Sequence, residues 1–171
     1  MNRRFGLAGR CLLSGLLFTI TLLGQGGPPG ARVSNLYAEP SEPGLILAAT
    51  TTGVFRSDNG GLSWGPSNLG LTTGAISKIT GSQGRLYLAT AVDGVFRSDD
   101  LGLTWRRVSD GLNTLDIRSI AVDPNDPDVV YAGTRNGGIF MTDNGGEGWI
   151  TVNNGLIIFT PTGETPIFEG L

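Results

Sequence analysis

The sequence of 171 residues predicts an all-β fold built from three copies of one four-stranded unit. An eight-residue phrase ending in tryptophan occurs at 57–64, 98–105 and 142–149, and its tryptophans are 41 and then 44 residues apart. A fixed period of this length indicates one repeated supersecondary unit whose apolar face is buried against the next unit. No segment after the N-terminus has the length and 3.6-residue periodicity of a soluble helix.

Each unit is expected to contain four short strands. It opens with an alternating strand, continues with a more apolar strand that ends in threonine, and has a third strand that leads into the phrase. The fourth run follows the tryptophan and ends at Gly-Leu. The first three strands are expected at 33–38, 45–50 and 53–56; at 76–80, 86–90 and 94–97; and at 117–122, 129–134 and 138–141. This pattern is typical of a β-propeller blade, so residues 33–156 are predicted to form three blades of a partial propeller.

The repeated phrase is expected to reverse the chain between the third and fourth strands. Glycines there can adopt positive φ, and the preceding Asp or Asn and Ser or Thr side chains can accept bonds from turn N–H groups. Burial of each tryptophan is worth about 2–3 kcal/mol, and Trp105, in the middle unit, is expected to matter most. The predicted structural residues are Ser57, Asn59, Gly61 and Trp64; Ser98, Asp100, Gly102 and Trp105; and Thr142, Asn144, Gly146 and Trp149.

The N-terminus has the layout of a secretory signal peptide over residues 1–26. Basic residues precede an uncharged, leucine-rich run at 11–24, which is short for a membrane span, and small residues follow it. Residues 27–32 are expected to be a linker. We therefore expect a secreted or periplasmic protein without a membrane span in its mature chain; an uncleaved N-terminal anchor is the alternative.

Composition excludes several kinds of chemistry. The chain has no histidine, and Cys11 is its only cysteine, so histidine triads, imidazole metal sites and disulfides in the mature chain are excluded. Without residues 1–26, nine basic residues face fifteen acidic ones, a balance of about −6 that argues against nucleic acid as a partner. No cofactor is predicted.

The phrases resemble the Asp-box, or BNR, repeat, written Ser-x-Asp-x-Gly-x-Thr-Trp. The second copy matches throughout, the first and third have asparagine at the Asp position, and the third has Gly148 at the Thr position. The wider pattern is similar to exported bacterial propellers of the BNR and sortilin-like type. Similar repeats occur in sialidases, xyloglucan-cleaving glycosidases and photosystem II assembly factors. In the sialidases the repeat lies at the blade periphery, so the resemblance implies a fold rather than an activity.

Closed propellers have 4–8 blades, and only three units are visible here. The repeat stops after Leu156, and residues 157–171 are expected to form a tail or one edge hairpin. Three interpretations follow, because exposed sheet edges are a liability. The chain is a truncated piece of a larger propeller, a half-propeller that pairs with a second copy to complete a ring, or an open stack.

For function, the sequence favours an exported, non-enzymatic scaffold that binds a protein or a glycan, and leaves enzymatic activity open. The alternative is a fragment of a glycoside hydrolase of the sialidase or xyloglucanase type, which would need two carboxylates about 5–10 Å apart. The acids outside the shared turn positions are the candidates: Asp93, Asp116 and Glu147. Solvated loop charges are the favoured interpretation of all three, so no catalytic residue is predicted.

One acidic turn suggests a calcium ligand set. Asp123, Asn125, Asp126 and Asp128 are close in sequence, and carboxylate and amide oxygens are ligands for Ca²⁺. Two prolines mark the segment as a turn, however, and the first unit builds the same turn from glutamates. A turn is therefore favoured, and no metal site is predicted.

Overall fold

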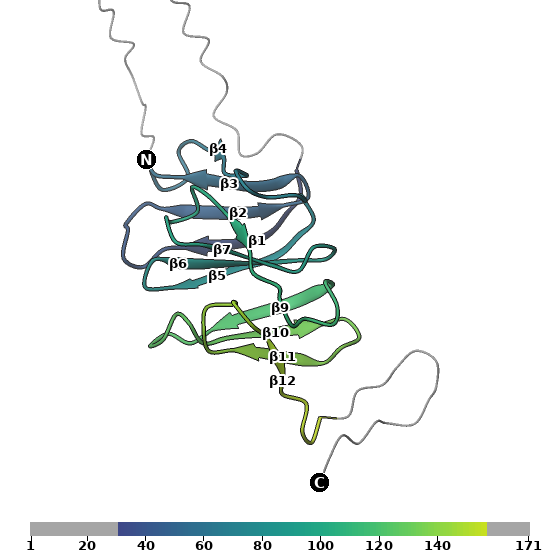
Figure 1. Ribbon diagram of the computed structural model, residues 1–171. Coiled ribbons are helices and arrows are strands. Elements are labelled where there is room, and N and C mark those ends of the chain that lie inside the picture. The colour runs from purple at the N-terminus through teal and green to yellow at the C-terminus, as the bar shows by residue number, and fades with distance from the viewer. Residues whose placement is uncertain (1–30, 157–171) are drawn as a thin grey trace, which may run out of the picture.

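The computed structural model describes residues 31–156, which form twelve strands in three four-stranded antiparallel sheets (Figure 1). The first sheet contains β1 (Val33–Ala38), β2 (Ile46–Thr50), β3 (Gly53–Ser57) and β4 (Gly65–Pro66). The second contains β5 (Ile76–Ser82), β6 (Arg85–Thr90), β7 (Val95–Ser98) and β8 (Arg106–Arg107). The third contains β9 (Ile117–Val122), β10 (Val130–Thr134), β11 (Ile139–Thr142) and β12 (Ile150–Thr151). The all-β prediction is confirmed.

Each sheet is a meander, because every strand pairs only with its neighbours in sequence. The fourth strand has two residues in each sheet, less than the run expected after each tryptophan. The backbone beyond it pairs with the next sheet instead: the carbonyl of Leu69 accepts a bond of 2.9 Å from the amide of Trp105. The outer edges of neighbouring sheets are therefore joined.

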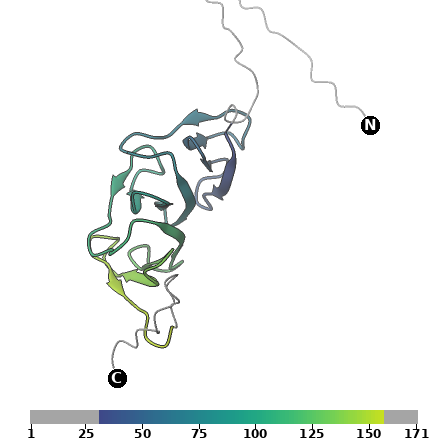
Figure 2. The same ribbon diagram turned by 90° about the vertical axis from the view of Figure 1, so that its right-hand side faces the viewer.

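The sheets lie one after another along the chain, and the view in Figure 2 shows them as successive layers of a curved stack. The first strands of neighbouring sheets, β1, β5 and β9, contact one another. Apolar side chains fill both junctions. The first cluster contains Leu45, Leu47, Ala49, Val54, Ile76, Ile79, Leu86, Leu88, Phe96 and Trp105. The second contains Tyr87, Ala89, Val95, Val108, Ile117, Ile120, Val130, Ala132, Phe140 and Trp149.

Strand alternation explains how the middle sheet serves both clusters. In β6, Leu86 and Leu88 belong to the first cluster, while Tyr87 and Ala89 belong to the second. Successive side chains of a strand point to opposite faces, so a strand buried on both faces is apolar almost throughout. This is why β6, the second strand of the middle unit, is apolar almost throughout.

The predicted signal peptide (1–26) and the predicted tail or hairpin (157–171) lie outside the described residues, as does most of the predicted linker. Its last residue, Arg32, is already tied to the first sheet, because its carbonyl accepts a 3.0 Å bond from the Thr51 amide. Among residues 31–156, no helix is long and apolar enough to cross a membrane.

Candidate functional site

The eight-residue phrases form three turns between the third and fourth strands of each sheet, here named the Trp turns (57–64, 98–105 and 142–149). In the second, the Ser98 hydroxyl donates to Asp100 Oδ1 at 2.7 Å and accepts from the Gly102 amide at 2.8 Å. Asp100 Oδ1 also accepts from the Thr104 amide at 2.9 Å. Gly102 has φ +85°, which favours glycine. These polar groups are therefore engaged in holding the turn.

The Asp100 carboxylate is the one full negative charge at this position of the three turns. Burial by itself would raise its pKa, but bonds from Thr104 and Ser98 outweigh burial and hold the pKa of Asp100 below its ordinary value. In the first turn, Asn59 bonds Ser63 through both its amide oxygen and its amide nitrogen. In the third, Asn144 accepts only from the backbone of Gly148 at this end of the turn.

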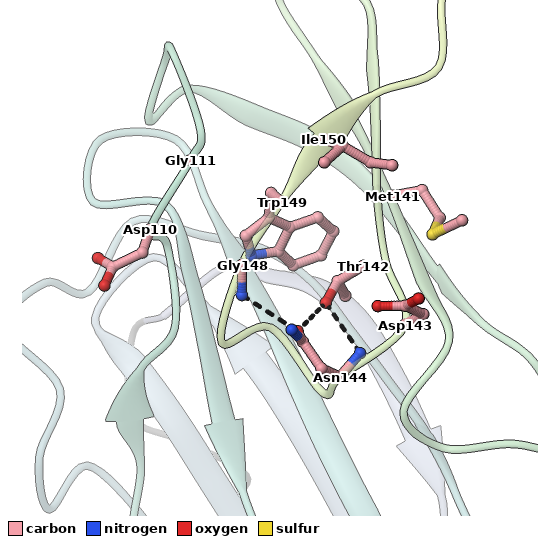
Figure 3. Close-up of a pocket in the computed structure, with 9 residues that line it drawn as sticks. All are labelled: Asp110, Gly111, Met141, Thr142, Asp143, Asn144, Gly148, Trp149 and Ile150. Atoms are coloured by element: carbon pink, nitrogen blue, oxygen red, sulfur yellow. Dashed lines mark hydrogen bonds between the residues drawn. The ribbon is translucent and has the colours of Figure 1, made fainter.

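A shallow hollow of about 350 Å³ lies beside the third Trp turn (Figure 3). Gly148 lines it at the position where the second turn has Thr104, so no hydroxyl-bearing side chain fills that space. The hydroxyl of Thr142 donates to Asn144 Oδ1 at 2.7 Å. The lining residues are Asp110, Gly111, Met141, Thr142, Asp143, Asn144, Gly148, Trp149 and Ile150.

The tryptophans connect each sheet to the one before it. The indole N–H of Trp105 donates to the Ser67 carbonyl at 3.0 Å, and that of Trp149 donates to the Val108 carbonyl at 2.9 Å. Both indoles are buried, whereas that of Trp64 in the first sheet is only half-buried. Burial thus follows from a preceding sheet, not from neighbours on both sides, because Trp149 in the last sheet is as buried as Trp105.

Two arginines connect each sheet to the one after it. Arg56 Nη1 donates to the carbonyl of Leu101 at 2.7 Å, and Arg97 Nη1 donates to the carbonyl of Gly145 at 3.0 Å. Both acceptors lie in the Trp turn of the following sheet. These arginines belong to the architecture.

The candidate acids lie at opposite ends of the strands. Asp93 and Asp116 are at the end opposite the Trp turns, on two segments joined by a bond of 3.0 Å from the Gly94 amide to the Leu115 carbonyl. Glu147 lies in the third Trp turn, where hydrogen bonding and charge from Arg106 hold the pKa of this carboxyl below its ordinary range. The structure therefore brings together two of the three candidates.

We name the end with Asp93 and Asp116 the loop end. Asp93 accepts from the Thr72 hydroxyl, and Arg107 Nε lies 3.3 Å from Asp93 Oδ1. Around Asp116, Arg118 Nε lies 2.7 Å from Oδ1, and Arg135 Nη1 lies 3.8 Å from Oδ2. The three arginine side chains are 46, 48 and 64% exposed, so their guanidinium groups also face solvent.

The acidic turn considered for calcium uses its oxygens locally. Asp123 Oδ1 accepts from the Asn125 amide at 2.8 Å, and Asp126 Oδ1 accepts from the Asp128 amide at 3.0 Å. Asp128 forms an ion pair with Arg85. In the part of the chain that the structure describes, no group of three or more acidic or other metal-ligating side chains gathers around one point.

Sequence reasoning missed the arginines of the loop end as a group. Arg118 could have been found, because it stands two residues after Asp116 and so on the same side of an extended chain. Arg107 follows Arg106 in the exposed strand β8, and two adjacent arginines are typical of a solvated strand. Arg135 has no local signal, since the fold alone brings the β10–β11 turn beside Asp116.

No protein-family model and no curated protein matches the chain. Solved structures do. Ycf48 from Cyanidioschyzon merolae is 21% identical, with a TM-score of 0.59 over 74% of this chain and 38% of that one. Ycf48 bound to D1 peptide has a TM-score of 0.58 at 17% identity, covering 72% and 40% of the two chains.

An ancestral GH74 enzyme is 24% identical, with a TM-score of 0.60 over 75% of this chain and 19% of that one. The GH74 xyloglucanase from Xanthomonas campestris is 16% identical, with a TM-score of 0.55 over 70% and 23%. The chain thus spans from about a fifth to two fifths of the length of these structures. All of these neighbours are β-propeller proteins, so the likeness confirms the predicted fold: three sheets of a partial β-propeller.

Proposed function

We propose that the chain is an exported, non-enzymatic binding scaffold of the Asp-box propeller type whose loop end holds a carboxylate-bearing protein segment. The observation that carries this proposal is the group of half-exposed arginines, Arg107, Arg118 and Arg135, around only two carboxylates. A guanidinium can bind a carboxylate through two parallel hydrogen bonds. Loops displayed on a rigid β scaffold are suited to such recognition.

Two further points support binding of a protein segment. Ycf48, a similar fold, has been solved bound to a peptide. Asp93 and Asp116 each form an ion pair with arginine, so both carboxylates are already engaged by cationic side chains. Recognition therefore suits this end of the molecule better than acid–base chemistry.

The test is fluorescence polarisation with labelled peptides that end in aspartate or glutamate, and with amidated counterparts in which that residue is asparagine or glutamine and the C-terminus is also an amide. We expect binding that weakens with salt, is lost on amidation and falls about ten-fold in Arg135→Ala. The matched control is Arg106→Ala, which removes the same charge near the Trp turns and should bind as the original chain does. Equal binding of acidic and amidated peptides would refute the proposal.

A glycosidase fragment is the second candidate, because Asp93 and Asp116 lie at one end of the stack. Incubation with xyloglucan and with sialosides tests it by product release. Hydrolysis that disappears in both Asp93→Asn and Asp116→Asn would establish this activity and overturn the non-enzymatic proposal. We expect no release.

A further inference from the structure

The first and third sheets each have an outer face that no other described residue covers, and they lie at opposite ends of the stack (Figure 1). On the first sheet, Val33 and Leu36 are 49 and 60% exposed, whereas the equivalent Ile76 and Ile79 of the second sheet are 5 and 2% exposed. The repeat has therefore placed core-type residues on a face against which no preceding sheet lies among residues 31–156.

The outer face of the third sheet is the opposite half of such a junction. Tyr131 and Val152 are exposed there, while their equivalents Tyr87 and Val108 are buried in the second sheet against the third. The strand registers match, since Tyr131 pairs with Met141 as Tyr87 pairs with Arg97. The outer face of the first sheet thus has the residues with which a sheet contacts the one before it. The outer face of the third sheet has the residues with which a sheet contacts the one after it.

A tyrosine and a proline turn make the first specific match. Tyr87 donates its hydroxyl to the carbonyl of Pro127 at 2.7 Å, in the β9–β10 turn of the next sheet. The first sheet has Pro43 at the corresponding turn position, and the outer face of the third sheet has Tyr131 at the Tyr87 position. The second sheet has no proline in its turn, and there the facing residue is Leu47. Tyrosine therefore occurs at this strand position where the turn of the following sheet contains proline, and leucine occurs where it does not.

The second match is a cluster of charged side chains at one junction whose equivalents on the uncovered faces are apolar. Glu147 pairs with Arg106 and lies 3.5 Å from Arg97, two residues that are register partners on the preceding sheet. At the position of Glu147, the first sheet has Leu62. At the positions of Arg97 and Arg106, the third sheet has Met141 and Ile150. Met141 and Ile150 are also register partners. All three charges are replaced together, so none of these three positions would bring an unpaired charge into the contact if these faces met.

The backbone supplies a third match. Gly111 has φ +91° and lies against the Trp149 carbonyl so closely that a Cβ there would collide with it. Gly155 has the corresponding φ of +78°, with nothing within 4 Å of a Cβ position. Trp64, half-buried on the first sheet, is the residue that such a glycine would meet.

We propose that a second copy of this chain docks the outer face of its first sheet on the outer face of the third sheet, and that two copies close a six-sheet ring. The contact is head to tail, and such contacts close when the rotation between copies permits it. The curved stack supplies a rotation, and six sheets lie within the 4–8 blades of closed propellers. Continuity with the two internal junctions and the matched residues favour a second copy as the occupant.

The test is analytical ultracentrifugation of the full chain over a concentration series. We expect a two-copy species whose dissociation constant rises at least ten-fold in Leu62→Glu, because a carboxylate would then face Met141 and Ile150. Adding Met141→Arg to that variant should restore association, because it recreates the Glu147–Arg97 pair between copies. Neither change touches the loop-end arginines, so assembly and ligand binding can fail separately.

Leu103→Glu is the matched control, since it is the same change in the second Trp turn and should leave the two-copy mass unchanged. Circular dichroism of each variant confirms that the sheets are retained. A monomer at every concentration, open polymers longer than two copies, or a double variant that fails to reassociate would each overturn the proposal.

Discussion

The first and second sheets present the same kind of face toward the preceding position in the stack, yet only one of the two is buried. Phe96 and Trp105 of the second sheet are buried in the first cluster, whereas Phe55 and Trp64 of the first sheet are partly exposed. Residue type is therefore the same, and the presence of a preceding sheet decides burial. A repeat sequence encodes both halves of an interface in every copy, including the copy at the end.

Truncation of the tryptophans should show the largest difference between the two faces. Trp105→Ala should destabilise the chain by about 3–5 kcal/mol, because it leaves a cavity in the first cluster and an unpaired Ser67 carbonyl. Trp64→Ala should cost less than half of that when both changes are made in the Leu62→Glu background, where the proposed contact between copies is broken. Urea unfolding followed by circular dichroism measures both, and equal losses would contradict this account of the junction.

Alanine at the junction glycines gives a sharper comparison of similar size. Gly111→Ala should cost about 3–4 kcal/mol, because it adds a collision with the Trp149 carbonyl to the penalty of a left-handed conformation. Gly155→Ala should cost only the conformational penalty, about 1–2 kcal/mol, in the same Leu62→Glu background. Thermal melting of both variants tests this, and a larger loss at Gly155 would mean that its surroundings are already filled.

The Trp turns provide a smaller, pH-dependent comparison. The lowered pKa of Asp100 means that its charged form favours the folded state. Its contribution is therefore present above the ordinary value near 3.8 and is lost as pH falls through the lower folded value. Asp100→Asn should cost about 1 kcal/mol at pH 7, and the difference should shrink below pH 4. Asp143→Asn, an exposed acid of the third turn, is the control and should show neither effect.

The smallest expected effect concerns Leu101, which has φ +58° where the other two turns have glycine. Its side chain packs against the first cluster, so it combines a strained backbone with a useful contact. Leu101→Gly should relieve the strain and lose the contact, a net change of under about 1 kcal/mol. Leu101→Ala loses the contact and keeps the strain, so it should be the less stable variant. The reverse order of melting temperatures would show that the strain is negligible.

Particular residues show how far prediction from sequence reached. The glycines of the Trp turns could be predicted because a tight reversal with positive φ is a local requirement. The length of β4 could not be predicted, because the chain after it is held by Trp105 of the next unit. The amide of Trp105 donates to the carbonyl of Leu69, which is 36 residues earlier in the chain. The loop end could not be predicted either, because Arg135 and Asp116 come together only through the pairing of β9 with β10 in the third sheet.

The sequence by itself determined the unit: four strands per repeat, apolar on the faces that meet, with a turn ending in tryptophan. These properties depend on residues close together in the chain, and backbone conformation and side-chain alternation act over that range. Only the tertiary structure decided which face is buried, which acids lie together and which arginines are engaged in junctions. Those outcomes depend on what lies next to a sheet in space, and identical repeats meet different neighbours at the middle and at the ends of a stack.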